Sequence, residues 1–329
     1  MIRPIARRLI VSGLLAAPLG ARRVAAEATS ASVWSPTHAV RVVIAYPPAG
    51  ASDIAGRWLA RKLAPRLGQP VVVENRPGAN GIIGTQHVAA SAPDGHTLMV
   101  TTADTHAVNP AVYRRLPYNA QDFVPVAPFA RLVFALVARR GLGIRDVGGF
   151  IDVARRSVLP LTYSSWGIAS TSQIMMETFG AGHDLRLQHV PFQGSASALA
   201  AVAAGQVDCM MAPVGLAIAQ DARLTPLGVV AGARFPAAPE CPTLNEQGFP
   251  LTGDLWVALL APPGTPIGVA ERVAAEVHAI VATQEATAFL IATGLVPDVQ
   301  DRPSFLVYLR EDAAVWQARV ERLGIRIDA

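Results

Sequence analysis

The 329-residue sequence predicts an α/β fold whose sheets are largely parallel. Two observations support this prediction. Short apolar stretches alternate with amphipathic stretches along most of the chain, which is the order of βαβ units. Several of these stretches, such as "VRVVIA" at 40–45 and "TPLGVVA" at 225–231, are apolar almost throughout. Such strands are typical of a sheet that helices cover on both faces.

Each predicted element follows from the local pattern of apolar residues. Apolar runs bounded by turn-forming residues predict strands at 40–45, 70–74, 97–102, 132–138, 159–163, 185–190, 206–211, 225–231 and 255–260. Amphipathic stretches between them predict helices at 53–67, 81–91, 171–180 and 196–204. Further helices are predicted after the last strand, with only short breaks, at about 266–283, 285–294 and 303–322. The chain is therefore expected to end in a helical tail.

The N-terminal segment has the three parts of a secretory signal peptide. Arginines precede an apolar stretch at 9–19, and small residues follow it. The apolar stretch is shorter than the roughly 20 residues that cross a bilayer. We therefore expect residues 1–26 to be a cleaved signal peptide, residues 27–38 to be a linker, and the mature protein to lie in the periplasm. The pair Arg7-Arg8 leaves both the general and the twin-arginine export route open.

The basic charge of the chain belongs to this leader. Removal of residues 1–26 takes away five arginines and no acid, so the formal net charge falls from +4 to −1. The mature chain then has no charge excess that favours a nucleic acid or a membrane surface as partner. Cys209 and Cys241 are the only cysteines. In an exported chain they can form one disulfide or stay as separate thiols, and the sequence leaves both alternatives open.

Four turns between a predicted strand and a predicted helix are rich in glycine and small polar residues. They are "YPPAGASD" at 46–53, "NRPGANG" at 75–81, "SSWGIASTS" at 164–172 and "PFQGSAS" at 191–197. In a parallel sheet such turns lie at the carboxyl ends of the strands, where a helix start offers unpaired N–H groups and about half a positive charge. Each turn alone is more simply explained by ordinary helix capping. Together the four turns predict a cleft that binds an anion.

These turns lie within a longer similarity to a known family. The chain from "YPPAGASDIAG" through "VVVENRPGANGIIG" to "APDGHTL" closely resembles the solute-binding receptors of tripartite tricarboxylate transporters, the Bug or TctC-like family. The similarity continues through "GIASTS", "VPFQGSASALAAVAAGQVD", "CPTLNEQGFP" and "WVALLAPPGTP", and it spans residues 39–329. The combination of these motifs is specific, whereas each one alone would be weak.

The resemblance implies a type II periplasmic binding protein-like fold, with two α/β domains joined by crossing strands and a cleft between them. Domain 1 is expected to comprise 39–136 and 256–329, and domain 2 to comprise 137–255. The implied function is capture of a small carboxylate (an organic acid, an aromatic acid or an amino acid) by domain closure, followed by delivery to membrane permease subunits. The protein is then not an enzyme, requires no cofactor or metal, and is expected to be a monomer.

Carried over position by position, the resemblance implies ligand-binding residues in both domains. Those of domain 1 are Pro48, Ala49, Gly50, Ala51, Ser52, Asp53, Asn80, Gly81, Thr102 and Asp104. Those of domain 2 are Ser164, Ser165, Trp166, Gly167, Ser170, Thr171, Gln193, Gly194, Ser195 and Asp208, the last of which is expected to open a strand near the cleft. In such receptors backbone amides and hydroxyl groups hold most of the ligand carboxylate, which agrees with the anion-binding turns.

Three of these positions depart from the family pattern. Ala49 replaces the first glycine of the usual Pro-Pro-Gly-Gly, so the loop must differ slightly if that position needs a positive φ. Gln193 stands where a lysine is frequent, and Trp166 stands where a small residue is usual. The lost cation and the bulky aromatic predict a ligand that is flatter, more apolar or less charged than a tricarboxylate. Trp166 can equally be a core residue beneath its loop.

Two other functions fit parts of the sequence. The first is an exported enzyme, but the glycines of "GANGIIG" are spaced G-x-x-G-x-x-G rather than G-x-G-x-x-G as in a dinucleotide site. The catalytic motifs G-x-S-x-G and H-E-x-x-H are absent, and the histidines lack ligand spacing. The second is a ligand sensor that reports to a membrane signalling partner. Closure on a ligand serves signalling and transport alike, so the sequence leaves both outputs open.

Overall fold

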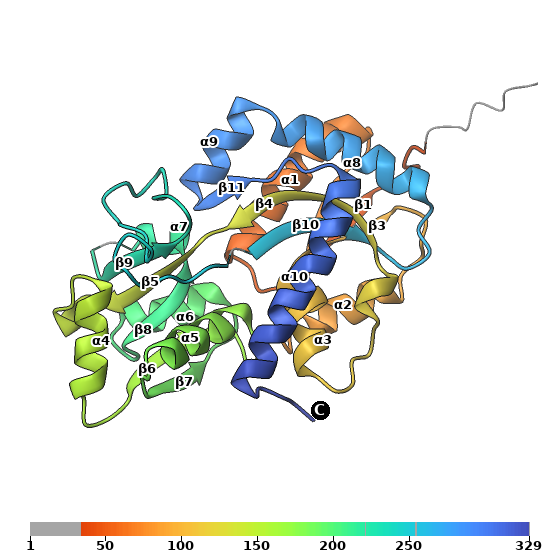
Figure 1. The fold of residues 1–329 in the computed structure, drawn as a ribbon. Helices are drawn as coiled ribbons and strands as arrows, with labels where there is room; N and C mark the ends of the chain where they lie inside the picture. Colours follow the sequence, from red (N-terminus) through yellow and green to blue (C-terminus); the bar gives the residue numbers. More distant parts are fainter. Residues whose placement is uncertain (1–33, 221, 254, 329) are drawn as a thin grey trace, which may run out of the picture. The chain divides into compact units, whose positions relative to one another are not determined.

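The computed structural model describes residues 34–220, 222–253 and 255–328. The expected signal peptide at 1–26 lies outside the described residues, as does most of the expected linker at 27–38. Within the described chain the strands form a six-stranded and a five-stranded sheet, and helices pack against both (Figure 1). Both sheets are mixed: among the described residues four strand pairings are parallel and five are antiparallel, so the sheets are less parallel than the sequence predicts. Each sheet nevertheless keeps the parallel βαβ units that the sequence predicts. The predicted α/β fold class is therefore confirmed.

The six-stranded sheet has the order β11-β4-β10-β3-β1-β2. Its strands are β1 (Val40–Ile44), β2 (Val71–Asn75), β3 (Thr97–Thr102), β4 (Val124–Leu132), β10 (Leu255–Ala261) and β11 (Leu295–Pro297). β1 pairs in parallel with β2 and β3, and the helices α1 (Ala51–Leu67) and α2 (Ile82–Ala89) connect these strands. The turns after β1, β2 and β3 therefore leave the sheet at the same edge.

The five-stranded sheet has the order β7-β6-β8-β5-β9. Its strands are β5 (Phe134–Arg139), β6 (Leu161–Ser165), β7 (Leu187–Pro191), β8 (Cys209–Pro213) and β9 (Leu224–Val230). β6 is parallel to β7 and β8, and the helices α5 (Thr171–Gly182) and α6 (Ser195–Ala203) follow β6 and β7. The turns after β6, β7 and β8 consequently meet at one edge of this sheet.

One nearly continuous extended segment joins the two sheets. Val133 alone separates β4 from β5, and Figure 1 shows these two strands following one another from the first sheet into the second. The sequence predicts a single strand at 132–138, because an apolar run does not reveal where its pairing partners change. The chain returns to the first sheet between β9 and β10. The expected domain limits, with a boundary at 136, stay a prediction.

The sequence misses most of β4 and the whole of helix α4 (Val147–Arg156). β4 contains Pro125 and Pro128, which ordinarily interrupt a strand, and its pairing with β10 shifts register twice. α4 begins with "VGG", a weak helix pattern, but the Asp146 carboxylate caps it by accepting a hydrogen bond from the amide of Gly149 at 2.7 Å. Short elements are also missed, among them α3 (Asn109–Val112), α7 (Val214–Ile218) and β11.

The helical C-terminal tail is confirmed, and comprises α8 (Ile267–Val281), α9 (Gln284–Ala292) and α10 (Arg302–Leu323). α10, dark blue in Figure 1, crosses the six-stranded sheet, where Phe305 packs edge-on against the buried Trp256 of β10. The Asp301 carboxylate caps α10 by accepting from the amide of Ser304 at 2.8 Å. None of the helices in the described ranges has both the length and the apolar character that a membrane crossing requires.

The two cysteines are separate thiols. Cys209 lies in β8 and Cys241 lies between β9 and β10, and both are buried and free. Burial raises the pKa of the Cys241 thiol to about 11, which keeps it protonated at neutral pH. The sequence leaves open whether these cysteines form a disulfide, and in the structure they do not.

The π-helical turn after β3, Asp104–Val108, carries a histidine in an apolar environment. The His106 ring packs edge-on against Phe123, with ring centroids 4.8 Å apart, and lies beside Tyr118 and Trp256. Burial lowers the pKa of His106 from 6.5 to about 3, so the folded protein keeps this ring neutral.

We predict that His106 lowers the stability of the protein as the pH falls from about 6.5 towards 3. In this window the unfolded chain binds a proton at His106 that the folded protein does not bind. The free energy of unfolding then decreases by up to about 1.4 kcal/mol per pH unit. His106→Gln removes this contribution. Urea denaturation between about pH 7 and pH 5 should show that the stability advantage of the wild type shrinks as the pH falls, and a constant difference would contradict the prediction.

Candidate ligand-binding site

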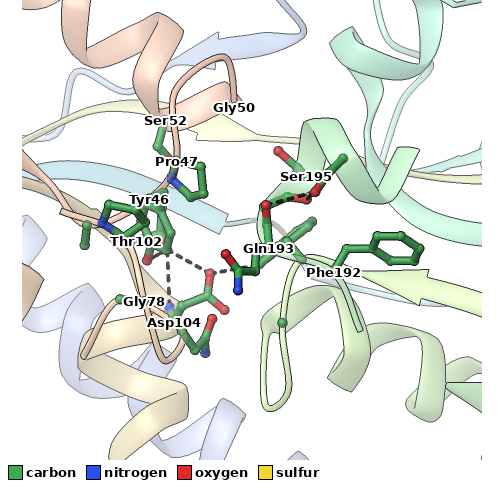
Figure 2. Close-up of a pocket in the computed structure, with 18 of the residues that line it drawn as sticks. Tyr46, Pro47, Gly50, Ser52, Gly78, Thr102, Asp104, Phe192, Gln193 and Ser195 are labelled. Atoms are coloured by element: carbon green, nitrogen blue, oxygen red, sulfur yellow. Dashed lines mark hydrogen bonds between the residues drawn. The ribbon is translucent and has the colours of Figure 1, made fainter. Parts of the chain in front are cut away.

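The carboxyl ends of the parallel strands surround a cavity of about 1220 Å³. Turns that follow strands of both sheets line it, and Figure 2 shows the residues after β1 and β3 on one side and those after β7 on the other. The lining residues are 45–48, 50–52, 77–81, 102, 104, 113, 132, 166–168, 191–197, 213, 255 and 327. The cavity is large enough to enclose a small molecule.

The structure brings most of the predicted ligand-binding residues together at this cavity. Those that line it are Pro48, Gly50, Ala51, Ser52, Asn80, Gly81, Thr102, Asp104, Trp166, Gly167, Gln193, Gly194 and Ser195. Those outside the lining are Ala49, Asp53, Ser164, Ser165, Ser170, Thr171 and Asp208. For the residues of the first set, contact with a ligand stays a prediction.

Three of the four predicted anion-binding helix starts open into the cavity. α1, α2 and α6 begin after Gly50, Gly81 and Gly194, and no side chain caps these three helices. The first N–H groups of a helix have no partner within it, and the helix dipole adds about half a positive charge there. In α2 the amides of Ile82 and Ile83 donate to the carbonyl oxygens of Ala79 and Gly78, at 3.0 and 3.5 Å, whereas the first amides of α1 and α6 have no such backbone partner among the described residues. Side-chain capping, the simpler explanation of each turn, therefore does not account for these three glycines.

The turns before α1 and α6 approach each other closely across the cavity. A Cβ atom on Gly50 would lie 3.2 Å from Ser195 Oγ, and one on Gly194 would lie 3.0 Å from Pro47 Cγ. Gly194 also has a φ of 96°, which residues with a side chain rarely adopt. Glycine at these two positions therefore permits the approach.

Asp53 shapes the turn before α1 and does not line the cavity. Its buried carboxylate accepts hydrogen bonds from the amide of Ala49 at 3.0 Å and from Arg57 Nε at 3.0 Å. Asn75 Nδ2 donates both to Asp53 Oδ1 at 2.7 Å and to the carbonyl oxygen of Tyr46 at 3.0 Å. These bonds hold the turn at both of its ends, so Asp53 is a positioning residue.

Asp104 connects the turn after β3, in the six-stranded sheet, to helix α5, which packs against the five-stranded sheet. Its buried carboxylate accepts hydrogen bonds from the amide of Thr171 at 2.6 Å, from Trp166 Nε1 at 3.3 Å and from Thr102 Oγ1 at 3.1 Å. Burial raises the pKa of Asp104 above its ordinary value, although these hydrogen bonds act in the opposite direction. A carboxylate of the protein thus occupies the start of α5, which the Ser170 side chain also caps.

Asn80 makes a second connection between the same two regions. Its Nδ2 atom donates to the carbonyl oxygen of Ala169, just before α5, at 3.0 Å and to Asn109 Oδ1 at 2.9 Å. Asn80 lines the cavity beside Gly81, so this bond joins its two sides next to the start of α2.

The sequence leaves open whether Trp166 faces the ligand or belongs to the core, and in the structure it does both. Its indole ring stacks on the buried Phe134, with ring centroids 5.8 Å apart and the planes 6° from parallel. The same residue lines the cavity. It therefore packs against the core and also forms part of the wall that a ligand would face.

The serines after β6 have structural partners. Ser164 Oγ donates to the carbonyl oxygen of Ala198 at 3.0 Å, and Ser165 Oγ donates to that of Gly167 at 2.8 Å. Both serines are buried and lie outside the cavity lining. These hydroxyl groups hold the turn and helix α6 in place.

The position expected for Asp208 is corrected by the structure. Asp208 precedes β8, whereas Pro213 at the other end of that strand lines the cavity. The Asp208 carboxylate instead accepts hydrogen bonds from Arg139 Nε at 2.9 Å and from the amide of Thr162 at 2.8 Å. It fails to reach the cavity because β8 is parallel to β6 and presents only its carboxyl end there.

The sequence does not predict most of the apolar wall of the cavity. Tyr113, Leu132, Leu255 and Ile327 contribute to it from positions far apart in the chain. Tyr113 and Ile327 meet in an isolated β-bridge, and no local pattern indicates such a contact. Among the described lining residues, Asp104 is the only acid, and none is a lysine, arginine or histidine.

Comparison with known proteins identifies relatives along nearly the whole chain. A family model described as tripartite tricarboxylate transporter family receptor matches residues 55–325. A UPF0065 protein encoded in the tcbD-tcbE intergenic region of Pseudomonas sp. (strain P51) is 35% identical over 295 residues, which cover 85% of this chain and 87% of that protein.

Two solved structures from Rhodopseudomonas palustris are also similar. Rpa4515 with adipate is 28% identical with a TM-score of 0.85, and the match covers 88% of this chain and 99% of that one. MatC (Rpa3494) with bound malate is 28% identical with a TM-score of 0.81, and the match covers 87% and 99% of the two chains. The predicted resemblance and the predicted periplasmic binding protein-like fold are confirmed.

We predict that Ala49→Gly stabilises the protein. Ala49 has a φ of 64°, so the loop keeps a left-handed residue although alanine replaces the usual glycine. Alanine in this conformation costs roughly 1 kcal/mol relative to glycine. Urea denaturation should show a gain of about that size, whereas Ala51→Gly, at the first position of α1, should destabilise. If Ala49→Gly instead lowers the free energy of unfolding, the claim that the backbone is strained at Ala49 is wrong.

Proposed function

The chain belongs to the tripartite tricarboxylate transporter receptor family, and on that premise we propose that it captures a small carboxylate in its cavity and delivers it to membrane permease subunits. Membership of a family of periplasmic binding proteins implies the periplasm as its location. Rpa4515 with adipate and MatC with malate support a carboxylate as the ligand class.

One observation of this chain carries the proposal. Three helices begin at glycines, have no side-chain cap, and open into the same cavity. A ligand carboxylate placed there accepts hydrogen bonds from the first amides of α1 and α6, and hydrogen bonds to a charged group contribute about 1.5–3 kcal/mol each. The first amides of α2 already donate to backbone carbonyl oxygens, so this helix contributes through its dipole. The hydroxyl groups of Ser52 and Ser195 line the cavity at two of these starts and can add further bonds.

Contacts between the two sides of the cavity support ligand-driven closure. Pro47 and Gly50 approach Gly194 and Ser195 at one side, while Asn80 bonds across to the turn before α5 at another. In the mechanism that we propose, the sheets move relative to each other about the β4–β5 segment. A ligand that contacts both sides binds the closed state better and so favours it.

The receptor, as we propose it, performs no chemistry and requires no cofactor. The relatives are receptors and binding proteins rather than enzymes. Within the described lining, no histidine, cysteine or lysine is present to act as a base or nucleophile, and the one acid, Asp104, already accepts hydrogen bonds from Thr171, Trp166 and Thr102.

A thermal-shift screen of the mature protein, residues 27–329, tests the ligand class. The panel contains mono-, di- and tricarboxylates, aromatic acids and amino acids. A ligand present at about a hundred times its Kd should stabilise the folded state by about 2.7 kcal/mol. If no acid raises the melting temperature, even after the protein is unfolded, dialysed and refolded to remove retained ligand, the proposed ligand class is wrong. Uptake of the identified acid by cells with and without this receptor then tests delivery.

We predict that Gly194→Ala weakens ligand binding about tenfold, or about 1.4 kcal/mol. The new methyl group would lie 3.0 Å from Pro47 Cγ and so hinder the approach of the turns before α1 and α6. Gly205→Ala is the matched control, because Gly205 also has a positive φ, 75°, but nothing lies within 4 Å of its added Cβ atom. Titration calorimetry with the acid found in the screen should show the loss only in Gly194→Ala. Equal affinities for the two variants would count against closure at this contact.

A further inference from the structure

The four helix starts that the sequence predicts as anion sites are not equivalent in the structure. α1, α2 and α6 open into the cavity without a side-chain cap, whereas the start of α5 holds the carboxylate of Asp104. Thr171 and Ser170, which begin α5, do not line the cavity, but Asp104 does. The protein's own carboxylate therefore separates one helix start from the ligand space.

The hydrogen bonds around Asp104 suit an ionised carboxylate. The Thr171 amide, the Trp166 indole N–H and the Thr102 hydroxyl all donate to it, and the Tyr46 hydroxyl bonds in turn to Thr102 Oγ1 at 2.8 Å. An ionised carboxylate only accepts, so three donors favour this form over the protonated one. Burial acts in the opposite direction and raises the pKa of Asp104 above its ordinary value. In the arrangement that we infer, the three donors keep the carboxylate ionised near neutral pH, and Asp104 brings a negative charge to the cavity wall.

No cation among the described lining residues offsets this charge. A dicarboxylate would bring two more negative charges, against which the cavity offers only the partial positive charges of three helix starts. A monocarboxylate has a single negative charge, which one helix start with its partial positive charge can stabilise. The rest of the wall suits an apolar body, since Tyr46, Trp166, Phe192 and Leu255 line it.

We propose that Asp104 is a built-in carboxylate that restricts this receptor to ligands with one carboxylate on an aromatic or alkyl body. The inference rests on the proposed function and names the ligand class of the same cavity. If Asp104 were absent, the start of α5 would offer its N–H groups to a second ligand carboxylate. With Asp104 in place, the far end of a diacid meets a negative charge. The residue therefore selects against diacids rather than for one particular monoacid.

Paired acids of matched shape test this selection. Benzoate is compared with terephthalate, and hexanoate with adipate, by titration calorimetry on the mature protein near neutral pH. For at least one pair, the wild type should bind the monoacid at least about tenfold more tightly than the diacid. This comparison needs no variant, so it does not depend on whether a substitution at Asp104 folds.

Substitution of Asp104 then tests whether this residue is the cause. Asp104→Asn removes the charge, and Asp104→Ala also vacates the start of α5. Each should lower the monoacid-to-diacid affinity ratio at least about tenfold, mainly by improving diacid binding. Asp146→Asn is the control, because Asp146 also holds a helix start and its loss changes the net charge equally, but it lies outside the cavity lining. It should leave the ratio unchanged.

The outcomes separate this inference from the proposed function. A wild type that prefers the diacid in both pairs, or a ratio that neither Asp104 variant changes, would overturn the selective role of Asp104 and leave the receptor in place. Failure of all four acids to bind to the wild type and to both variants would overturn this inference, whereas the proposed ligand class is overturned only if the full panel of the thermal-shift screen fails as well.

Discussion

The first amide groups of a helix need partners from outside that helix, and this constraint determines how the cavity is built. In α4, α9 and α10 the side chains of Asp146, Thr283 and Asp301 supply the missing acceptors. In α2 the backbone carbonyl oxygens of Gly78 and Ala79 supply them. In α1 and α6 a glycine begins the helix, no side chain caps it, and the residues around the start line the cavity. The site is thus defined by helix starts left open rather than by a reactive group.

Buried carboxylates of the protein use the same interaction to organise the region around the cavity. Asp53 binds the amide of Ala49 and so shapes the turn that begins α1, while Asp104 binds the amide of Thr171 and joins the two sheets. A buried carboxylate is stable only when donors surround it, and both of these accept several hydrogen bonds. One type of bond, from an amide to a carboxylate, therefore shapes the turn before α1, connects the two sides and, in our proposal, holds the ligand.

This arrangement also explains how the loop before α1 tolerates alanine in place of glycine. The left-handed conformation of Ala49 costs roughly 1 kcal/mol, whereas a hydrogen bond to a charged group such as Asp53 contributes about 1.5–3 kcal/mol. The bond outweighs the strain, so the loop keeps its shape. Of the other positions that depart from the family pattern, Gln193 and Trp166 both line the cavity, and Trp166 also packs on Phe134 and donates to Asp104.

The sequence by itself determined the features that depend on neighbours along the chain. Apolar runs predicted the strands and the α/β class, and glycine-rich turns predicted which loops meet at the cavity, because burial and turn formation are local properties.

Only the tertiary structure decided which of these groups remain available to a ligand. Asp104 and Asp208 both adjoin strands, yet only Asp104 follows the carboxyl end of its strand and lines the cavity, while the predicted strand at 206–211 begins earlier than β8 does. Likewise, Thr171 begins a helix as Ser195 does, but a carboxylate 67 residues away already binds its amide. Whether a donor is satisfied depends on partners distant in sequence, and the pattern of nearby residues does not contain that information.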